Sequence, residues 1–434
     1  MASVRDLIVK ITAPRASRFL ANLGWLGLAE FCIRLSRLAA TVVLARWLSP
    51  YDYGLAALVL TTNEFVHMFT QNGIWDKLVQ ARKEDLPHLC HTAYCLNWLI
   101  CGALCALQCL LTFPIAWFYH DTRLIWPICT MACVYLMLPP VLIQASLSQR
   151  ENRLHVIALA NGVQVCTDNV LAMILALYGF GMWAIVLPKL LTAPIWSVIQ
   201  YVNHPWRPAR QFTLRHGREI LDFGKHVLGV KLLGTLRNNL DYVIASSFLG
   251  IEALGLYYFA FNAGLGLSMS AINAVDAALF PHLCAVRDNP RQFQARFFSS
   301  LTTITWVIVP LVAVQSSLAP WYVPLVFSTK WIPAIPLLIL VCLSAIPRPY
   351  ANAASKALWA LDKPAVDLRW GVLFTTLFAL ALLVGVRWHV LGVAAAVLAT
   401  HMLAMPLYTF WVTRVYVRGT DLPLDPTPAP TTPA

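Results

Sequence analysis

The chain has 434 residues, of which 59% are hydrophobic and only 12% are charged, and its formal net charge is +12. Soluble globular domains carry about 25% charged residues, so this composition excludes both an ordinary soluble enzyme and a disordered chain. Because the apolar residues form long blocks, the composition predicts a protein that is embedded in a lipid bilayer.

In chain order, a basic segment comes first, at residues 1–19, and it lacks the apolar core and cleavage site of a signal peptide. Mostly apolar blocks of about the length that spans a bilayer follow it. The twelve expected helices are 20–45, 53–78, 89–118, 124–148, 154–177, 181–202, 226–248, 254–281, 298–319, 333–359, 366–386 and 390–413. The Pro- and Thr-rich end at 416–434 is expected to be a disordered cytoplasmic tail.

Positive charge outside these blocks is strongly asymmetric. With twelve spans, the side that holds both termini carries 20 lysines and arginines, and the opposite side carries Arg46, Arg123, Lys330 and Arg387. Because cytoplasmic loops are enriched in Lys and Arg, both termini are predicted to be cytoplasmic. The 20 residues are Arg5, Lys10, Arg15, Arg18, Arg82, Lys83, Arg150, Arg153, Arg207, Arg210, Arg215, Arg218, Lys225, Arg287, Arg291, Arg296, Lys363, Arg369, Arg414 and Arg418. The basic stretch at 203–225 is interpreted as a cytoplasmic loop near anionic lipid, rather than as a nucleic-acid site.

An internal repeat divides the chain into two halves. The segment TVVLARWLSPYDYGLAALV, from Thr41, aligns with YVIASSFLGIEALGLYYFA, from Tyr242, at a constant offset of 201, and Gly54 meets Gly255 near the matched turn. Chance similarity between apolar strings is the alternative. The repeat predicts an N-terminal lobe at 20–202 and a C-terminal lobe at 226–415, each with six helices in the same membrane orientation, joined by a cytoplasmic loop at 203–225.

Charged residues interrupt the apolar blocks, although a charge at bilayer depth is costly and persists by facing a protein interior or an aqueous cavity. The deep bases fall on helical stripes; they are Arg34, Arg37, Lys189, Lys231, Arg237, Arg348 and Lys356. The deep acids are Glu30, Glu64, Asp168, Asp241 and Asp276. This excess of bases predicts a cationic cavity between the halves, which suits an anionic cargo such as a diphosphate or an acidic sugar.

The same charges allow a structural interpretation. Glu30 and Arg34, like Arg237 and Asp241, are four residues apart and can neutralise each other along one helix. The five acids, Glu30, Glu64, Asp168, Asp241 and Asp276, are also candidates for coupling transport to H⁺ or Na⁺, because a carboxyl group in a low-dielectric site can titrate near neutral pH. No other cofactor is expected.

Several enzyme and metal functions lack sequence support. The cysteines at helical spacing, Cys101, Cys105 and Cys109, are interpreted as packing residues rather than as metal ligands. The chain has no phosphate-binding loop of the GxxxxGK[ST] type and no motif for nucleophilic or acid–base catalysis. All the outer loops are short, which argues against a membrane glycosyltransferase, polymerase or ligase with a catalytic outer domain.

Several motifs resemble one transporter family. They are ARWLSPYDYGL after the first helix, QNGIWDKLVQ after the second, LSQRENRL after the fourth and GFGMWAIVL at the sixth, together with NNLDYVIASSFLGIEALGLYYFAFNAG, LFPHLCAVRDN, WIPAIPLLIL and ALDKPAV in the second half. They resemble Wzx-type polysaccharide-transport proteins, the flippases of lipid-linked oligosaccharides. That family lies in the superfamily of multidrug and toxic-compound extrusion proteins and lipid II flippases.

The resemblance implies an all-α polytopic membrane protein with two six-helix lobes in a V, working by alternating access in the bacterial inner membrane. It implies a lumen in which bases hold the diphosphate of an undecaprenyl-linked glycan; the residues that fit are Arg34, Arg37, Arg237 and Arg348, followed by Lys231 and Lys356. Membrane lipids, and the polymerase and export machinery of the same pathway, are the expected partners, and no nucleic acid is expected. The alternatives are an ion-coupled exporter of drugs or organic cations, a membrane glycosyltransferase or polymerase, and a scaffold subunit.

Overall fold

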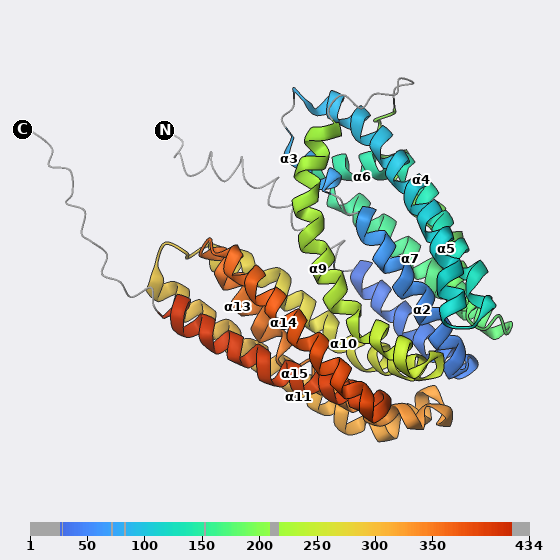
Figure 1. Ribbon diagram of the computed structural model, residues 1–434. Coiled ribbons are helices and arrows are strands. Elements are labelled where there is room, and N and C mark those ends of the chain that lie inside the picture. Colours follow the sequence, from blue (N-terminus) through green and yellow to red (C-terminus); the bar gives the residue numbers. More distant parts are fainter. Residues whose placement is uncertain are drawn as a thin grey trace, which may run out of the picture. The chain divides into compact units, whose positions relative to one another are not determined.

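A computed structural model describes residues 27, 29–70, 73–81, 84–151, 153–208 and 217–418 of the chain (Figure 1). Within these ranges the regular secondary structure is helical and contains no strand. The segment expected at 1–19 lies outside the described ranges, and so does the tail expected at 416–434 except for residues 416–418, of which Tyr416 and Val417 are helical. The predicted all-α membrane architecture is therefore confirmed for the part of the chain that can be described.

The helices follow one another with short connections. The first half holds a helix at 29–47 and then α2 (Pro50–His67), α3 (Ile74–Gln80), α4 (Leu86–Phe118), α5 (Ile125–Met137), α6 (Pro139–Arg150), α7 (Leu154–Leu177) and α8 (Trp183–Asn203). The second half holds α9 (Gly217–Leu249), α10 (Ile251–Cys284), α11 (Pro290–Tyr322), α12 (Ile335–Leu343), α13 (Arg348–Ala360), α14 (Pro364–Gly385) and α15 (His389–Val412).

Among the described residues, six helical segments are long and apolar enough to cross a membrane, and a seventh is added if the bent pair α5–α6 counts as one span. The protein is therefore a multi-pass membrane protein. Each of the twelve expected blocks contains helical residues. Several of those helices carry the charged side chains described below and are not among the six apolar segments. The count of twelve spans stays a prediction.

The block expected at 53–78 is not one helix, because α2 ends at His67 and α3 begins at Ile74, after Gly73 at a φ of 77°. Two more expected spans are interrupted at prolines. The block expected at 124–148 is bent by 56° where α5 gives way to α6, which begins with Pro139 and Pro140. The block expected at 333–359 is divided into α12 and α13 by a short non-helical segment that ends at Pro347. Proline has no backbone N–H and its ring clashes with the preceding turn, so each interruption falls where a continuous helix would lose its hydrogen bonds.

The second half begins earlier than expected. α9 starts at Gly217, inside the segment 203–225 that was expected to be a loop. The charged residues at 217–225 indicate where the chain leaves the bilayer, but a helix can continue into water, so charge does not mark its first residue. Residues 209–216 of the expected loop lie outside the described ranges.

The chain forms two compact units. The first contains residues up to Phe259 together with Trp321–Ala334, and the second contains Ala260–Pro320 and the residues from Ile335 onward. In the first unit α7 packs on α8, α4 on α5 and α2 on α9, and in the second α15 packs on α12, α13 and α14. The six-helix lobes expected at 20–202 and 226–415 stay a prediction.

The turns within the two copies of the repeat are made by different residue types but occupy matched positions. In the first copy Ser49 caps α2 in a capping box with Asp52, and in the second Gly250 turns the chain at a φ of 86°. A positive φ costs glycine little because it has no Cβ. α2 begins at Pro50 and α10 at Ile251, an offset of 201, which supports the repeat at this point.

Candidate functional site

The polar residues of the first unit include a paired acid and base on the helix at 29–47. Arg34 Nε lies 3.1 Å from Glu30 Oε1, and both side chains are more than a third exposed. Arg37, one turn further on, is exposed. Asn169 on α7 donates a hydrogen bond of 2.9 Å to Ser36 Oγ, so α7 contacts the same helix. The pairing expected within one helix is therefore present for Glu30 and Arg34.

A second ion pair joins α7 to α8. Lys189 Nζ lies 3.1 Å from Asp168 Oδ2, and the exposed fractions of the two side chains are 37% and 17%. The other carboxylate oxygen, Asp168 Oδ1, is buried and has no hydrogen-bond partner among the described residues. One buried oxygen of this carboxylate is therefore left without a described donor.

The polar residues of α2 and α9 lie on helices that pack against each other. Glu64 on α2 is exposed, while Lys231 and Arg237 on α9 are half-buried. Asp241 is buried, and its Oδ2 accepts a hydrogen bond of 2.6 Å from the Tyr257 hydroxyl. Asp241 thus takes part in holding the end of α9 to the start of α10.

The second unit contains a third ion pair. Lys356 Nζ on α13 lies 3.7 Å from Asp276 Oδ2 on α10, and 4.6 Å from the centre of the Trp359 ring. Asp276 Oδ1 is buried and has no hydrogen-bond partner among the described residues. The guanidinium carbon of Arg348, at the start of α13, lies 6.0 Å from the centre of the Phe261 ring. Aromatic faces attract cations at such distances.

Three ion pairs involve predicted deep charges. Arg34, Lys189 and Lys356 are the bases of these pairs, with Glu30, Asp168 and Asp276 as the acids. Over all the predicted deep charges, seven are bases and five are acids, and the predicted excess of positive charge is the difference between these two counts.

Sequence reasoning missed several buried polar residues. In α4, the Gln108 amide donates to the Ile128 carbonyl at 2.9 Å and accepts from the Tyr135 hydroxyl at 3.1 Å. In α11, Gln315 accepts a hydrogen bond of 2.8 Å from Ser268. A single glutamine inside a long apolar helix was the available signal, because burying an amide is favourable only when a partner satisfies it.

Two of the four bases that the charge pattern assigns to the outer side cap helix ends. Lys330 Nζ donates to the carbonyls of Arg46 and Leu48, at 2.9 and 2.6 Å, and Trp331 Nε1 donates to that of Ala45 at 2.7 Å. Arg46 in return donates to the carbonyls of Leu325 and Val326, at 3.0 and 2.7 Å. The last carbonyls of a helix have no partner within it and carry partial negative charge, which cations stabilise.

Arg123, a third base that the charge pattern assigns to the outer side, also makes contacts with neighbouring side chains. Arg123 lies 3.6 Å from the Asp121 carboxylate, and its guanidinium lies 5.5 Å from the centre of the Tyr51 ring. Asp121 also accepts a hydrogen bond from the Tyr51 hydroxyl, and this bond raises the pKa of Tyr51 above its ordinary value. These contacts connect the start of α2 to the end of α4.

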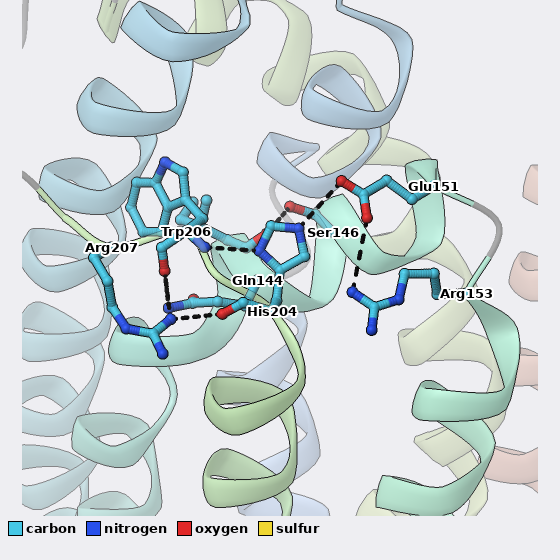
Figure 2. A network of polar contacts seen from close by, with 8 residues as sticks. Gln144, Ser146, Glu151, Arg153, His204, Trp206 and Arg207 are labelled. Carbon is cyan, nitrogen blue, oxygen red and sulfur yellow. Dashed lines mark hydrogen bonds and ion pairs between the residues drawn. The ribbon is translucent and has the colours of Figure 1, made fainter.

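At the other end of the first unit, a polar network holds the chain that leaves α8 (Figure 2). The Trp206 backbone N–H donates to His204 Nδ1 at 3.1 Å, so in the neutral ring the proton lies on Nε2, which is 3.3 Å from Glu151 Oε1. Gln144 on α6 donates to the Trp206 carbonyl at 3.3 Å. Arg207 donates to the carbonyls of Tyr201, His204 and Trp206. Residues 204–207 are therefore fixed to α6 and to the end of α8.

A family model described as "Polysaccharide biosynthesis protein" matches residues 43–336, more than half of the chain. The chain belongs to this family. The resemblance to polysaccharide-transport proteins that the sequence motifs indicated is confirmed.

Relatives and solved structures agree with this membership. The lipopolysaccharide biosynthesis protein WzxC of Escherichia coli (strain K12) is 23% identical over 368 residues, which cover 83% of this chain and 74% of that protein. The lipid II flippase MurJ in an inward closed conformation shares the fold, with a TM-score of 0.73 and 13% identity. The match covers 90% of this chain and 87% of that protein's chain. A multidrug resistance MATE transporter in an inward-facing conformation has a TM-score of 0.69 and 14% identity. The match covers 89% of this chain and 95% of that protein's chain.

The family match covers only part of the predicted site. Lys231 and Arg237 lie within the matched residues, whereas Arg34, Arg37, Arg348 and Lys356 lie outside them. The fold is common to a flippase and to a drug transporter, so it does not by itself choose between those cargoes. The role of each predicted site residue stays a prediction.

Proposed function

We propose that this protein is a transporter rather than an enzyme, and that it flips lipid-linked oligosaccharide repeat units outward across the bacterial inner membrane for surface or exopolysaccharide synthesis. Membership of the polysaccharide biosynthesis family supports the pathway. The shared fold of a lipid II flippase supports the type of movement. The carrier lipid in this proposal is undecaprenyl diphosphate, and both termini are cytoplasmic.

The observation that carries the proposal is the excess of predicted deep bases over predicted deep acids, seven against five. Arg37, Arg237 and Arg348 have guanidinium groups, which bind the oxygens of a diphosphate in a bidentate manner, and Lys231 adds a point charge. The deep acids, which are Glu30, Glu64, Asp168, Asp241 and Asp276, are fewer than the deep bases, so positive charge is in excess. A drug or organic-cation exporter would require the opposite sign.

Ion coupling forms a second part of the proposal. Asp168 and Asp276 each have one carboxylate oxygen bound to a lysine and one buried oxygen without a hydrogen-bond partner among the described residues. We propose that these two acids, rather than the exposed Glu64, take up H⁺ or Na⁺ during the transport cycle. Binding a cation would weaken the pull of each carboxylate on its lysine.

Depletion of the protein in its native host, followed by measurement of lipid-linked intermediates on each face of the inner membrane, tests the proposal. Accumulation on the cytoplasmic face is the expected result. Unpolymerised units on the outer face would indicate a polymerase, and normal sidedness combined with increased drug sensitivity would indicate an exporter. Complementation with wild-type protein, with Arg37→Gln and with the control Arg387→Gln ties the result to the proposed bases.

A further inference from the structure

The second unit contains a cavity between the start of α14 and the end of α15, two helices that lie side by side (Figure 1). Its volume is about 610 Å³. The side chains that line it include Arg369, Trp370 and Leu373 from α14, and Tyr408, Trp411 and Tyr416 from the end of α15 and the turn after it. We call this cavity the α14–α15 groove.

Ring stacking and hydrogen bonds hold the side chains of one wall of the groove in place. Trp370 and Tyr408 stack with their ring centres 4.6 Å apart and their planes within 5°. The Tyr408 hydroxyl donates to Asp367 Oδ1 at 2.8 Å, and the same carboxylate accepts from Ser355 at 2.6 Å and from Trp359 at 2.9 Å. Asp367 does not line the groove, and three donors already occupy its oxygens.

The groove has a positive charge at one place. Arg369 is exposed, and the described side chains that line the groove include this single cation and no acid. Its guanidinium offers several N–H donors in a fixed plane, which match the oxygens of a phosphate group. The indoles of Trp370 and Trp411 and the hydroxyl of Tyr416 add neutral donors beside it, whereas the Tyr408 hydroxyl already donates to Asp367. The groove is therefore chemically suited to an anionic group of low charge.

An exposed apolar strip continues from the groove along both helices. On α14 it is formed by Leu373, Leu377 and Leu380, which are 52%, 44% and 56% exposed. On α15 it is formed by Leu403, Leu407 and Phe410, which are 67%, 66% and 63% exposed. These residues recur at intervals of three and four, so each set lies on one helix face. A ligand with an anionic head and a long hydrocarbon chain would cover both the groove and the strip.

The position of the groove agrees with such a ligand. The loop charges predict that the start of α14 and the end of α15 lie at the cytoplasmic face, where Lys363, Arg369, Arg414 and Arg418 are concentrated. Aromatic side chains are typical of the membrane–water interface, and basic pockets between spanning helices on the cytoplasmic side bind anionic headgroups.

We propose that the α14–α15 groove is a binding site for an anionic phospholipid. The phosphodiester lies on Arg369, the glycerol hydroxyls face the aromatic donors, and an acyl chain lies along the leucine strip. A phosphodiester carries one negative charge, which one guanidinium balances, whereas a polyprenyl diphosphate carries more. The site therefore favours a phospholipid of the surrounding bilayer over the lipid-linked cargo, and it does not depend on which cargo the protein moves.

Native mass spectrometry of the purified full-length protein in detergent tests the proposal. The wild type should bind phosphatidylglycerol about tenfold more tightly than phosphatidylcholine with the same acyl chains, as a charge-assisted contact would give. Arg369→Gln should abolish this preference. Arg387→Gln, the same change just beyond the opposite end of α14, should leave the preference for phosphatidylglycerol intact.

Two more variants and one competitor keep the test decisive. Arg369→Lys retains the charge but not the planar fork, so it should keep part of the preference, and Trp411→Phe removes one indole donor and should weaken binding of both lipids. Equal binding of the two lipids by the wild type, or equal losses in the Arg369 and Arg387 variants, would overturn the proposal. Stronger competition by undecaprenyl diphosphate than by phosphatidylglycerol would also overturn it, because the groove would then belong to the cargo.

Discussion

Gly54 of α2 lies against the first residue of α10, and Gly255 of α10, which is 201 residues further along the chain, lies against the first residue of α2. A Cβ on Gly54 would overlap the carbonyl of Ile251, the first residue of α10, and a Cβ on Gly255 would overlap the carbonyl of Pro50, the first residue of α2. Pro50 and Ile251 are themselves related by the offset of the repeat. The contact is therefore reciprocal between equivalent positions, as a two-fold arrangement would produce.

Gly54→Ala should destabilise the protein, because the atoms that the new methyl group meets belong to backbone and cannot rotate away. Overpacking of a well-packed interior costs about 1–3 kcal/mol, and rigid backbone places this case at the upper end. The measurement is thermal unfolding of the purified protein in detergent. Gly102→Ala is the control, since a Cβ there meets nothing within 4 Å. Equal melting temperatures for the two variants would show that the crossing tolerates a side chain.

Lys189→Met should lower the melting temperature more than the double change Asp168→Asn with Lys189→Met. The single change leaves a largely buried carboxylate without its cation, whereas the double change removes both charges. Contacting residues show coupling free energies of about 0.5–3 kcal/mol in such cycles. Asp168→Asn alone completes the cycle. If the two single effects simply add, Lys189 and Asp168 do not stabilise each other.

Lys330→Met should destabilise the end of the helix at 29–47, because the carbonyls of Arg46 and Leu48 lose their ammonium donor. Trp331→Phe should have a similar effect by removing the donor to Ala45, while keeping the aromatic stack with Phe259, whose ring centre lies 3.9 Å from that of Trp331. Hydrogen exchange at residues 44–48 is the measurement. Faster exchange is expected in both variants and not in Arg387→Gln.

Arg237→Gln and Arg37→Gln should each reduce export of the lipid-linked oligosaccharide at unchanged protein level, if these bases contact the diphosphate. Loss of a charge-assisted contact costs about 1.5–3 kcal/mol, which corresponds to at least tenfold in affinity. Arg37→Lys should restore part of the activity, because the charge remains while the planar fork is lost. Full export by both glutamine variants would remove these two residues from the site.

His204→Ala should loosen the chain that follows α8. The ring accepts a hydrogen bond from the Trp206 backbone and lies beside Glu151, and the side chain is 5% exposed (Figure 2). Without it, we expect faster chymotryptic cleavage after Trp206 in the folded protein. His155→Ala, at an exposed position on α7, is the matched control. Unchanged cleavage would show that Arg207 and Gln144 hold the segment without the histidine.

Long apolar blocks were the most reliable guide to the fold. The expected helix at 154–177 coincides with α7, and the one expected at 390–413 differs from α15 by one residue at each end. Both are mostly apolar blocks between polar turns, so local composition defines their ends. The bend at Pro139 and the early start of α9 were not predicted, because membrane helices often tolerate proline and because charge marks the bilayer boundary rather than the helix end.

The sequence by itself determined the class of the protein, the family resemblance and the positions of the deep charges, because each of these depends on residue type and local spacing. Only the tertiary structure decided which charges on different helices are paired. Asp168 and Lys189 are 21 residues apart, and Asp276 and Lys356 are 80 apart, so their pairing depends on which helices pack together. The same holds for Arg46 and Lys330, which the sequence could interpret only as loop charges and which the fold uses to cap helix ends 284 residues apart. Helical periodicity is a local property, whereas the partner of a buried or capping charge is set by long-range packing.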